Sequence, residues 1–421
     1  MTYARARPER TRVRLFPQSP MAGQSRLERV ELFPRRGEVR PGPEDDRMYV
    51  AEAPGKRPYG GDSGRLRFPP YGGAVLAPAR PGPDGHFDHL APGDPGFRQV
   101  HLYGCARMAL DVWEAYLDRR IPWHFERDFA KLEVLALWDW ANAHMGYGYL
   151  EAGAYQLDDG GLADYALDFD IVAHEVGHAI MMSFASSFGS PRRTDEYGAF
   201  HEASADWAAL VASLHFDQAV VDLLEMTRGD LDGINQLTRF AELNAHWQIR
   251  VTNNAFTMWD FTAGWKSEHD LALPLIAALY DAFVQVYKTI LVRSGAIPPA
   301  LFDLSEAAEI TPGLRGAVSA GFARWYARRP QAFYDALIDA REIAARMLIG
   351  LWRIADPGEF SFARLPELLG AVDRRDFGGE LYPIVRGCLG RRGIGFVPPG
   401  PRLRPDGEDG HAHSVRTAMP D

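Results

Sequence analysis

Two histidines separated by three residues, in a His-Glu-Val-Gly-His run over residues 174–178, constrain the fold of this chain more than any other feature. Residues four apart lie on the same face of an α-helix, so His174 and His178 can share one metal ion if the run is helical. Acidic residues before the run and an apolar stretch after it predict a helix over about 168–188. Glu175 is then expected beside the two ligands, as a general base.

A second motif follows 24 positions after His178, where the chain reads Glu202-Ala-Ser-Ala-Asp206. Two histidines, one carboxylate and an open position for water form the donor set of a catalytic zinc site, whereas structural zinc sites are closed and cysteine-rich. Glu202 is therefore the predicted third ligand. Asp206 lies one turn later and is predicted to accept a hydrogen bond from the second ring nitrogen of His174.

Together the two motifs resemble those of the gluzincin metallopeptidases, in particular the thermolysin and fungalysin group. The segment 198–206 is similar to the Gly-Ala-x-x-Glu-Ala-x-x-Asp helix of that group. The metzincins fit less well, because Phe184 stands where their third histidine is expected. The resemblance implies an α+β, zincin-like fold with a mixed β/α N-terminal lobe and a mostly α-helical C-terminal lobe. It places zinc in the cleft between the two lobes.

Three further segments extend this resemblance. Asn142 and Ala143 match the start of the family's edge strand, which pairs with the extended substrate backbone. His269, 67 residues after Glu202, matches the histidine that stabilises the oxyanion. Arg239 lies in the region where the family keeps an arginine that binds the substrate carbonyl. The family's catalytic tyrosine has no match here.

The resemblance implies a zinc-dependent endopeptidase in which Glu175 takes a proton from a zinc-activated water. The implied cofactor is Zn²⁺; Ca²⁺ is left open as a second ion, because Asp168 and Asp170 resemble a calcium position in thermolysin relatives. The sequence leaves two alternatives to an active endopeptidase. One is a zinc-stabilised scaffold or binding protein whose catalysis has lapsed, and the other is an enzyme inhibited by its own N-terminal arm.

Charge and composition suggest how the chain is divided. Residues 1–40 contain ten arginines and four glutamates, although the whole chain carries a net charge of −10. The sequence predicts an irregular Pro/Gly/Arg-rich arm over 1–95, an N-terminal catalytic lobe over 96–190, a helical lobe over 191–392 and a disordered tail over 393–421. Strands are expected within 129–165. Helices are expected at about 97–117, 199–214, 217–227, 233–247, 269–293, 304–310, 314–327, 330–349 and 362–371.

The expected partner is a peptide or protein substrate. No stacking pattern of aromatic residues suggests nucleic acid, and no run of 18 apolar residues suggests a membrane span. Because the basic start is not followed by an apolar stretch, no secretory signal is recognised, and a cytoplasmic location is expected, with leaderless export left open. The oligomeric state is not predicted.

Overall fold

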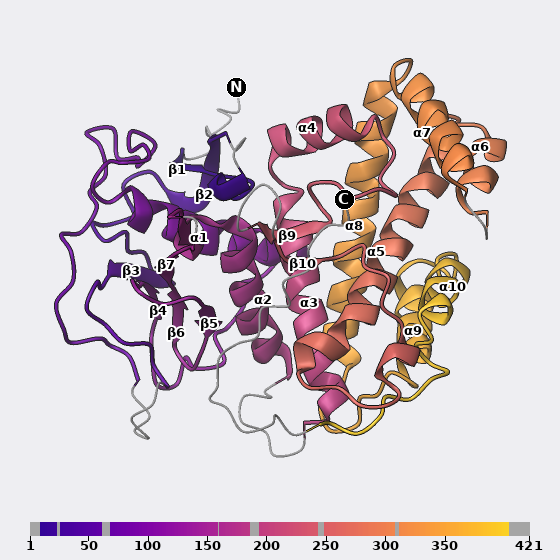
Figure 1. Ribbon diagram of the computed structural model, residues 1–421. Helices are drawn as coiled ribbons and strands as arrows, with labels where there is room; N and C mark the ends of the chain where they lie inside the picture. Colours follow the sequence, from indigo (N-terminus) through magenta and orange to yellow (C-terminus); the bar gives the residue numbers. More distant parts are fainter. Residues whose placement is uncertain are drawn as a thin grey trace, which may run out of the picture. The chain divides into compact units, whose positions relative to one another are not determined.

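A computed structural model describes residues 9–22, 26–60, 68–158, 160–185, 193–242, 248–307 and 311–403. The described residues up to 185 form one compact unit, and those from 193 onward form another, apart from 241, 242 and 248, which group with the first (Figure 1). The first unit combines small sheets with helices, and the second is almost entirely helical. The fold class is therefore α+β, as predicted.

The first unit is built on a mixed four-stranded sheet with the strand order β3-β4-β6-β5. Its strands are β3 (Met48–Glu52), β4 (Leu132–Ala136), β5 (Ala143–Met145) and β6 (Tyr149–Ala152). Strands β3, β4 and β6 are parallel, whereas β5 runs antiparallel to β6 at one edge. All five residues of β4 are buried, as expected for a strand covered on both faces.

Two long helices pack against this sheet, α1 (Phe97–Leu117) and α2 (Phe169–Ala185). They match the helices predicted over 97–117 and 168–188. Polar residues are also buried in α1, where Arg107 pairs with Asp111 at 2.8 Å and with Asp45 at 3.1 Å. Such pairing is what allows charged side chains to remain in a core.

The segment 1–95, expected to be an irregular arm, supplies three strands to this unit. In addition to β3, it forms a hairpin of β1 (Arg10–Leu15) and β2 (Glu28–Arg35), which packs on α1. In β1 the side chains of Val13 and Leu15 are buried, and the arginines alternate with them. This period of two is typical of a half-buried strand, but the content of Pro, Gly and Arg favoured the prediction of an irregular arm. Two shorter strands, β7 (Ala154–Gln156) and β8 (Leu162–Asp164), pair with each other.

The second unit is organised around α5 (Glu268–Arg293), which contacts α3, α6, α8 and α10. Its other helices are α3 (Asp195–Ser213), α4 (Asp217–Thr227), α6 (Pro299–Ser305), α7 (Pro312–Tyr326), α8 (Pro330–Ile354), α9 (Leu365–Asp376) and α10 (Tyr382–Arg391). By length and composition α5 could cross a membrane, but 67% of its apolar window is buried inside the protein, as in a core helix.

The helix predicted over 233–247 is wrong. The described part of this segment is a turn followed by β9 (Arg239–Glu242), which pairs with β10 (Gln248–Val251). Asn235 fixes the turn, because its Oδ1 accepts the Leu237 N–H at 2.9 Å and its own N–H donates to Thr238 Oγ1 at 2.8 Å. Such local side-chain bonds compete with helix formation.

Some helices have bounds several residues away from those predicted. The helix expected at 304–310 overlaps only the end of α6, which starts at Pro299, and residues 308–310 lie outside the described part; the helix expected at 362–371 is α9, with Pro366 in its first turn. Helix α10, with Pro383 in its first turn, was not predicted. Proline is favourable there because it donates no N–H and its φ is already helical. The first part of the predicted tail is also ordered, since Leu403 N–H donates to the Trp265 carbonyl at 2.8 Å; residues 404–421 lie outside the described part.

Candidate metal centre

Helix α2 carries the His-Glu-x-x-His run in its middle. The helix begins after Asp168, whose Oδ1 accepts the Ile171 N–H at 3.1 Å and so satisfies one of the free donors of the first turn. Burial raises the pKa of this carboxyl to about 6, against the effect of the hydrogen bonds that it accepts. Apolar residues on α2 pack into the first unit and fix the orientation of the helix; they include Val172, Val176, Ala179 and Ile180.

This orientation buries all three polar residues of the run. His174 is 4% exposed, Glu175 7% and His178 9%. The two imidazole rings lie one turn apart with their centroids 4.5 Å from each other, and their planes are nearly perpendicular at 83°. The histidines are therefore held as a pair by the helix alone, as the spacing predicts.

Helix α3 carries the second motif. Thr194 caps it, its Oγ1 accepting the Tyr197 N–H at 3.0 Å. A Cβ on Gly198 would lie only 2.2 Å from the Glu268 carboxyl carbon, so a larger residue there would displace this side chain at the start of α5. Helix α3 therefore lies close to the start of α5 at this position. It brings Glu202, one turn along α3, next to His269 on α5.

Glu202 and His269 are in direct contact in the second unit. The Nδ1 atom of His269 lies 2.8 Å from Oε2 of Glu202, and the side chains are 43% and 13% exposed, respectively. The resemblance implied a place for His269 near the reacting carbonyl, and its contact with Glu202 was not predicted. No local pattern indicates this contact, because the two residues lie 67 positions apart on different helices.

His174, His178 and Glu202 form a group that could hold a metal ion. One ligand atom from each lies within 4.8 Å of those of the other two. Two imidazole nitrogens and a carboxylate oxygen suit zinc and several other divalent transition metals, so the geometry alone does not choose the ion. The predicted ligand set is thus brought together, and the metal's identity stays a prediction.

The remaining predicted site residues fall in different places. Asp206 is 1% exposed on α3, and its role beside His174 stays a prediction. Ala143 begins the edge strand β5, which packs against α2, and Asn142 precedes it with its carbonyl accepting the Gly153 N–H at 3.0 Å. Arg239 lies on strand β9, not on the predicted helix.

The backbone pattern of β5 shows which of its groups are open. The Asn142 carbonyl and the Gly146 N–H both bond to the β6 side. In an antiparallel ladder the bonded residues alternate, so the N–H and C=O groups of Ala143 and Met145 point away from β6. Among the described residues β5 ends the strand order of its sheet, so these groups lie on the edge to which an extended chain could add.

No family model matches this chain, and no curated protein matches its sequence. Any functional assignment therefore depends on the motifs and on the geometry described above.

Proposed function

We propose that this protein is a zinc-dependent endopeptidase with a two-lobed, zincin-like fold of the gluzincin type. The observation that carries the proposal is the group of three ligand atoms from His174, His178 and Glu202, with Glu175 buried beside the histidines on the same helix. A structural metal site would not require a carboxylate at that position. The donor set also lacks cysteine, unlike most closed structural sites.

The three ligands would leave one coordination position open in a tetrahedral site. Zinc, when bound, lowers the pKa of a coordinated water towards neutrality and polarises the substrate carbonyl. Glu175 follows His174 directly in the sequence, which places its carboxylate at the flank of the metal-binding face. We assign to it the acceptance of the water proton and the transfer of that proton to the leaving amine.

His269 would complete the site from α5. Its Nδ1 contacts Glu202, so we assign the contact with a substrate to Nε2. A protonated imidazole donates from both nitrogens, so the same ring can hold Glu202 and stabilise a developing oxyanion. The contact thus adds a second task, positioning Glu202, to the role predicted from the resemblance.

A peptide substrate would lie along β5. Its backbone would pair with the outward N–H and C=O groups of Ala143 and Met145, as in other cases of strand addition to an open edge. Asn142 precedes this edge and is a further candidate for contact with the substrate. Arg239 is retained only as a predicted substrate-binding residue.

The test pairs metal content with cleavage of a denatured protein, for wild type and Glu175→Gln. Wild type should bind stoichiometric zinc and cleave the substrate, whereas Glu175→Gln should keep the zinc and lose activity by about a hundredfold or more. Glu225→Gln, at an exposed position on α4, is the matched control and should behave as wild type.

Two outcomes would contradict the proposal in different ways. Stoichiometric zinc without cleavage by the wild type would favour the zinc-stabilised scaffold. Absence of zinc from protein purified without chelator, and from protein reloaded with zinc, would overturn the metal centre itself.

A further inference from the structure

The second unit contains a polar cavity with no part in the metal centre. Its volume is about 360 Å³, within the range of small-molecule sites. It is bordered by α5, the end of α6, α7, the end of α10 and the loops after α4 and β10. The charged side chains that line it are Asp232, Asp281, Glu306, Arg315 and Arg391.

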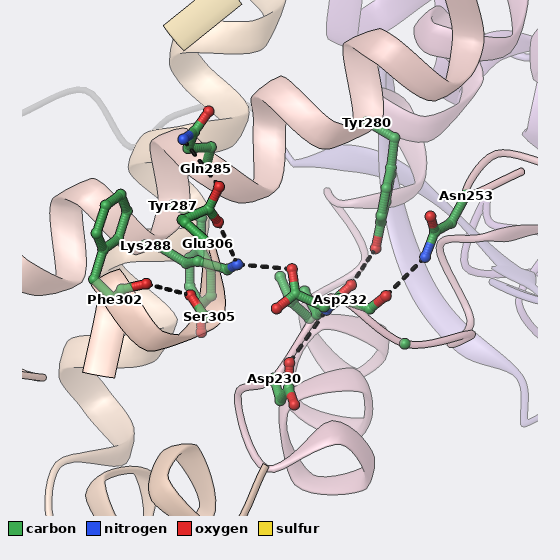
Figure 2. Close-up of polar contacts among 12 residues, drawn as sticks. Asp230, Asp232, Asn253, Tyr280, Gln285, Tyr287, Lys288, Phe302, Ser305 and Glu306 are labelled. Carbon is green, nitrogen blue, oxygen red and sulfur yellow. Dashed lines mark hydrogen bonds and ion pairs between the residues drawn. The ribbon is translucent and has the colours of Figure 1, made fainter. Parts of the chain in front are cut away.

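A buried lysine fixes one wall of this cavity. Lys288 lies on α5 with its side chain 2% exposed, and its Nζ lies 2.7 Å from both Asp232 Oδ1 and Glu306 Oε1 (Figure 2). A buried ammonium group is tolerated only when paired, so these carboxylates are held in place. Arg315 extends the chain of charges, pairing with Asp232 at 3.2 Å and with Asp230. The wall is therefore preorganised.

Two charged groups on the cavity, Asp281 and Arg391, can still bond to a ligand, although Asp281 is already paired with Arg392 through one oxygen. Both nitrogens of Arg392 that bind Asp281 use its Oδ2, at 3.0 and 3.1 Å, which leaves Oδ1 as an acceptor. Arg391 contacts Cys388 Sγ at 3.1 Å, and within the described part of the chain it has no carboxylate partner. The other lining charges, Asp232, Glu306 and Arg315, are already paired.

The mixed charges of the lining disfavour ligands of a single sign. Outside the metal centre, the described residues include no other group of three ligating side chains close enough to hold a metal ion. The ammonium of Lys288 already occupies the space between Asp232 and Glu306, where a second cation would be repelled. A phosphate or other polyanion would face three carboxylates. A molecule with one negative and one positive group can bind Arg391 with the first and Oδ1 of Asp281 with the second.

We propose that this cavity binds a small zwitterion of the amino-acid class, with its carboxylate on Arg391 and its ammonium group on Asp281. A guanidinium can bind a carboxylate through two parallel hydrogen bonds, which gives both affinity and orientation. Val284 and Ala307 also line the cavity, and they form an apolar surface for the ligand's side chain. The assignment does not depend on the peptidase proposal, because no lining residue belongs to the metal centre.

The experiment screens the full-length protein by thermal shift against the twenty protein amino acids, each at the same millimolar concentration. The amino acid that stabilises most is then titrated by calorimetry, together with its N-acetyl derivative and its carboxamide. Each derivative removes one charge and should bind at least about tenfold more weakly. Glycerol and glucose serve as uncharged probes and should not bind.

Variants locate the site. Arg391→Gln and Asp281→Asn should each weaken binding at least about tenfold. Arg386→Gln, an exposed arginine on the same helix α10 that does not line the cavity, should bind as wild type. Melting temperatures without ligand establish that each variant is folded.

Several results would overturn the proposal. They are the absence of binding by every amino acid, equal binding of the uncharged derivatives, binding of glycerol or glucose instead, or unchanged affinity in a folded Arg391→Gln protein. None of these results bears on metal content or peptide cleavage, so this proposal and the peptidase proposal fail separately.

Discussion

His101, at the residue scale, shows how the first unit holds a buried histidine in one protonation state. The Phe16 N–H donates to its Nε2 at 3.0 Å, and its Nδ1 lies 3.0 Å from the Ala166 carbonyl. The ring must therefore be the neutral tautomer with the proton on Nδ1. Complete burial lowers the pKa of His101 to about 4, because the charged form would lose its hydration.

This arrangement predicts an acid sensitivity. Between pH 6.5 and about 4 the unfolded chain binds a proton at His101 that the folded protein does not, so stability is lost as the pH falls through this window. The contribution of His101 to this decrease in the free energy of unfolding should approach about 3 kcal/mol. His101→Gln, which keeps one donor and one acceptor, should be less stable at pH 7 but show a flatter dependence on pH.

Urea unfolding of wild type and His101→Gln across this pH range measures the effect. His89→Gln, at an exposed histidine, is the control and should keep the wild-type pH profile. Parallel profiles for wild type and His101→Gln would show that His101 is not the group that titrates.

The pairing of the two histidines was predictable at this scale because both lie on one helix. The spacing of His174 and His178 on α2 needs no knowledge of the tertiary fold. The contact between His269 and Glu202 joins residues 67 positions apart, and the pairing of Lys288 with Asp232 joins residues from different elements. Local patterns carry no information on such pairs.

At the element scale, β5 is the feature on which substrate binding should depend. Proline at an edge position whose N–H points outward keeps the strand pairing but removes that donor. We therefore expect Ala143→Pro to raise KM for a peptide substrate about tenfold, because the substrate loses one hydrogen bond. The melting temperature should change little. Ala143→Ser keeps the N–H and is the matched control.

Steady-state kinetics on a peptide substrate, together with thermal melts, test this expectation. A folded Ala143→Pro protein with wild-type KM would mean that the substrate does not pair with this edge.

Helices were predicted well where apolar residues repeat with one clear periodicity. Helices α1, α2 and α4 follow the 3.6-residue pattern and were placed within a few residues of their observed bounds. The error at 233–247 has a different origin, because an apolar stripe was given more weight than Asn235 and Thr238, whose side chains bond the local backbone. Turn chemistry prevailed there over helical periodicity.

At the scale of the whole molecule, the N-terminal segment is part of the fold. Strand β3 pairs with β4 along its full length, and Arg47 just before it forms a buried ion pair with Glu114. Removing residues 1–95 would take a strand out of the sheet, so such a deletion would not separate inhibition from unfolding. Release of a self-inhibited enzyme is better sought with shorter deletions that end before β1, because these leave the β1–β2 hairpin and β3 in place.

Metal binding should also stabilise the whole molecule. An ion that binds only the folded state raises the free energy of unfolding by mass action. The increase is about 4 kcal/mol when the free ion concentration is a thousand times Kd. We therefore expect chelation to lower the melting temperature by several degrees and zinc to restore it. His178→Ala lacks one ligand, so its melting temperature should be low from the start and should respond weakly to either treatment. Thermal melts with zinc content measured in the same samples make the comparison direct. If verified metal-free wild type melts at the same temperature as the reloaded protein, the His174, His178 and Glu202 group does not hold zinc in the folded state.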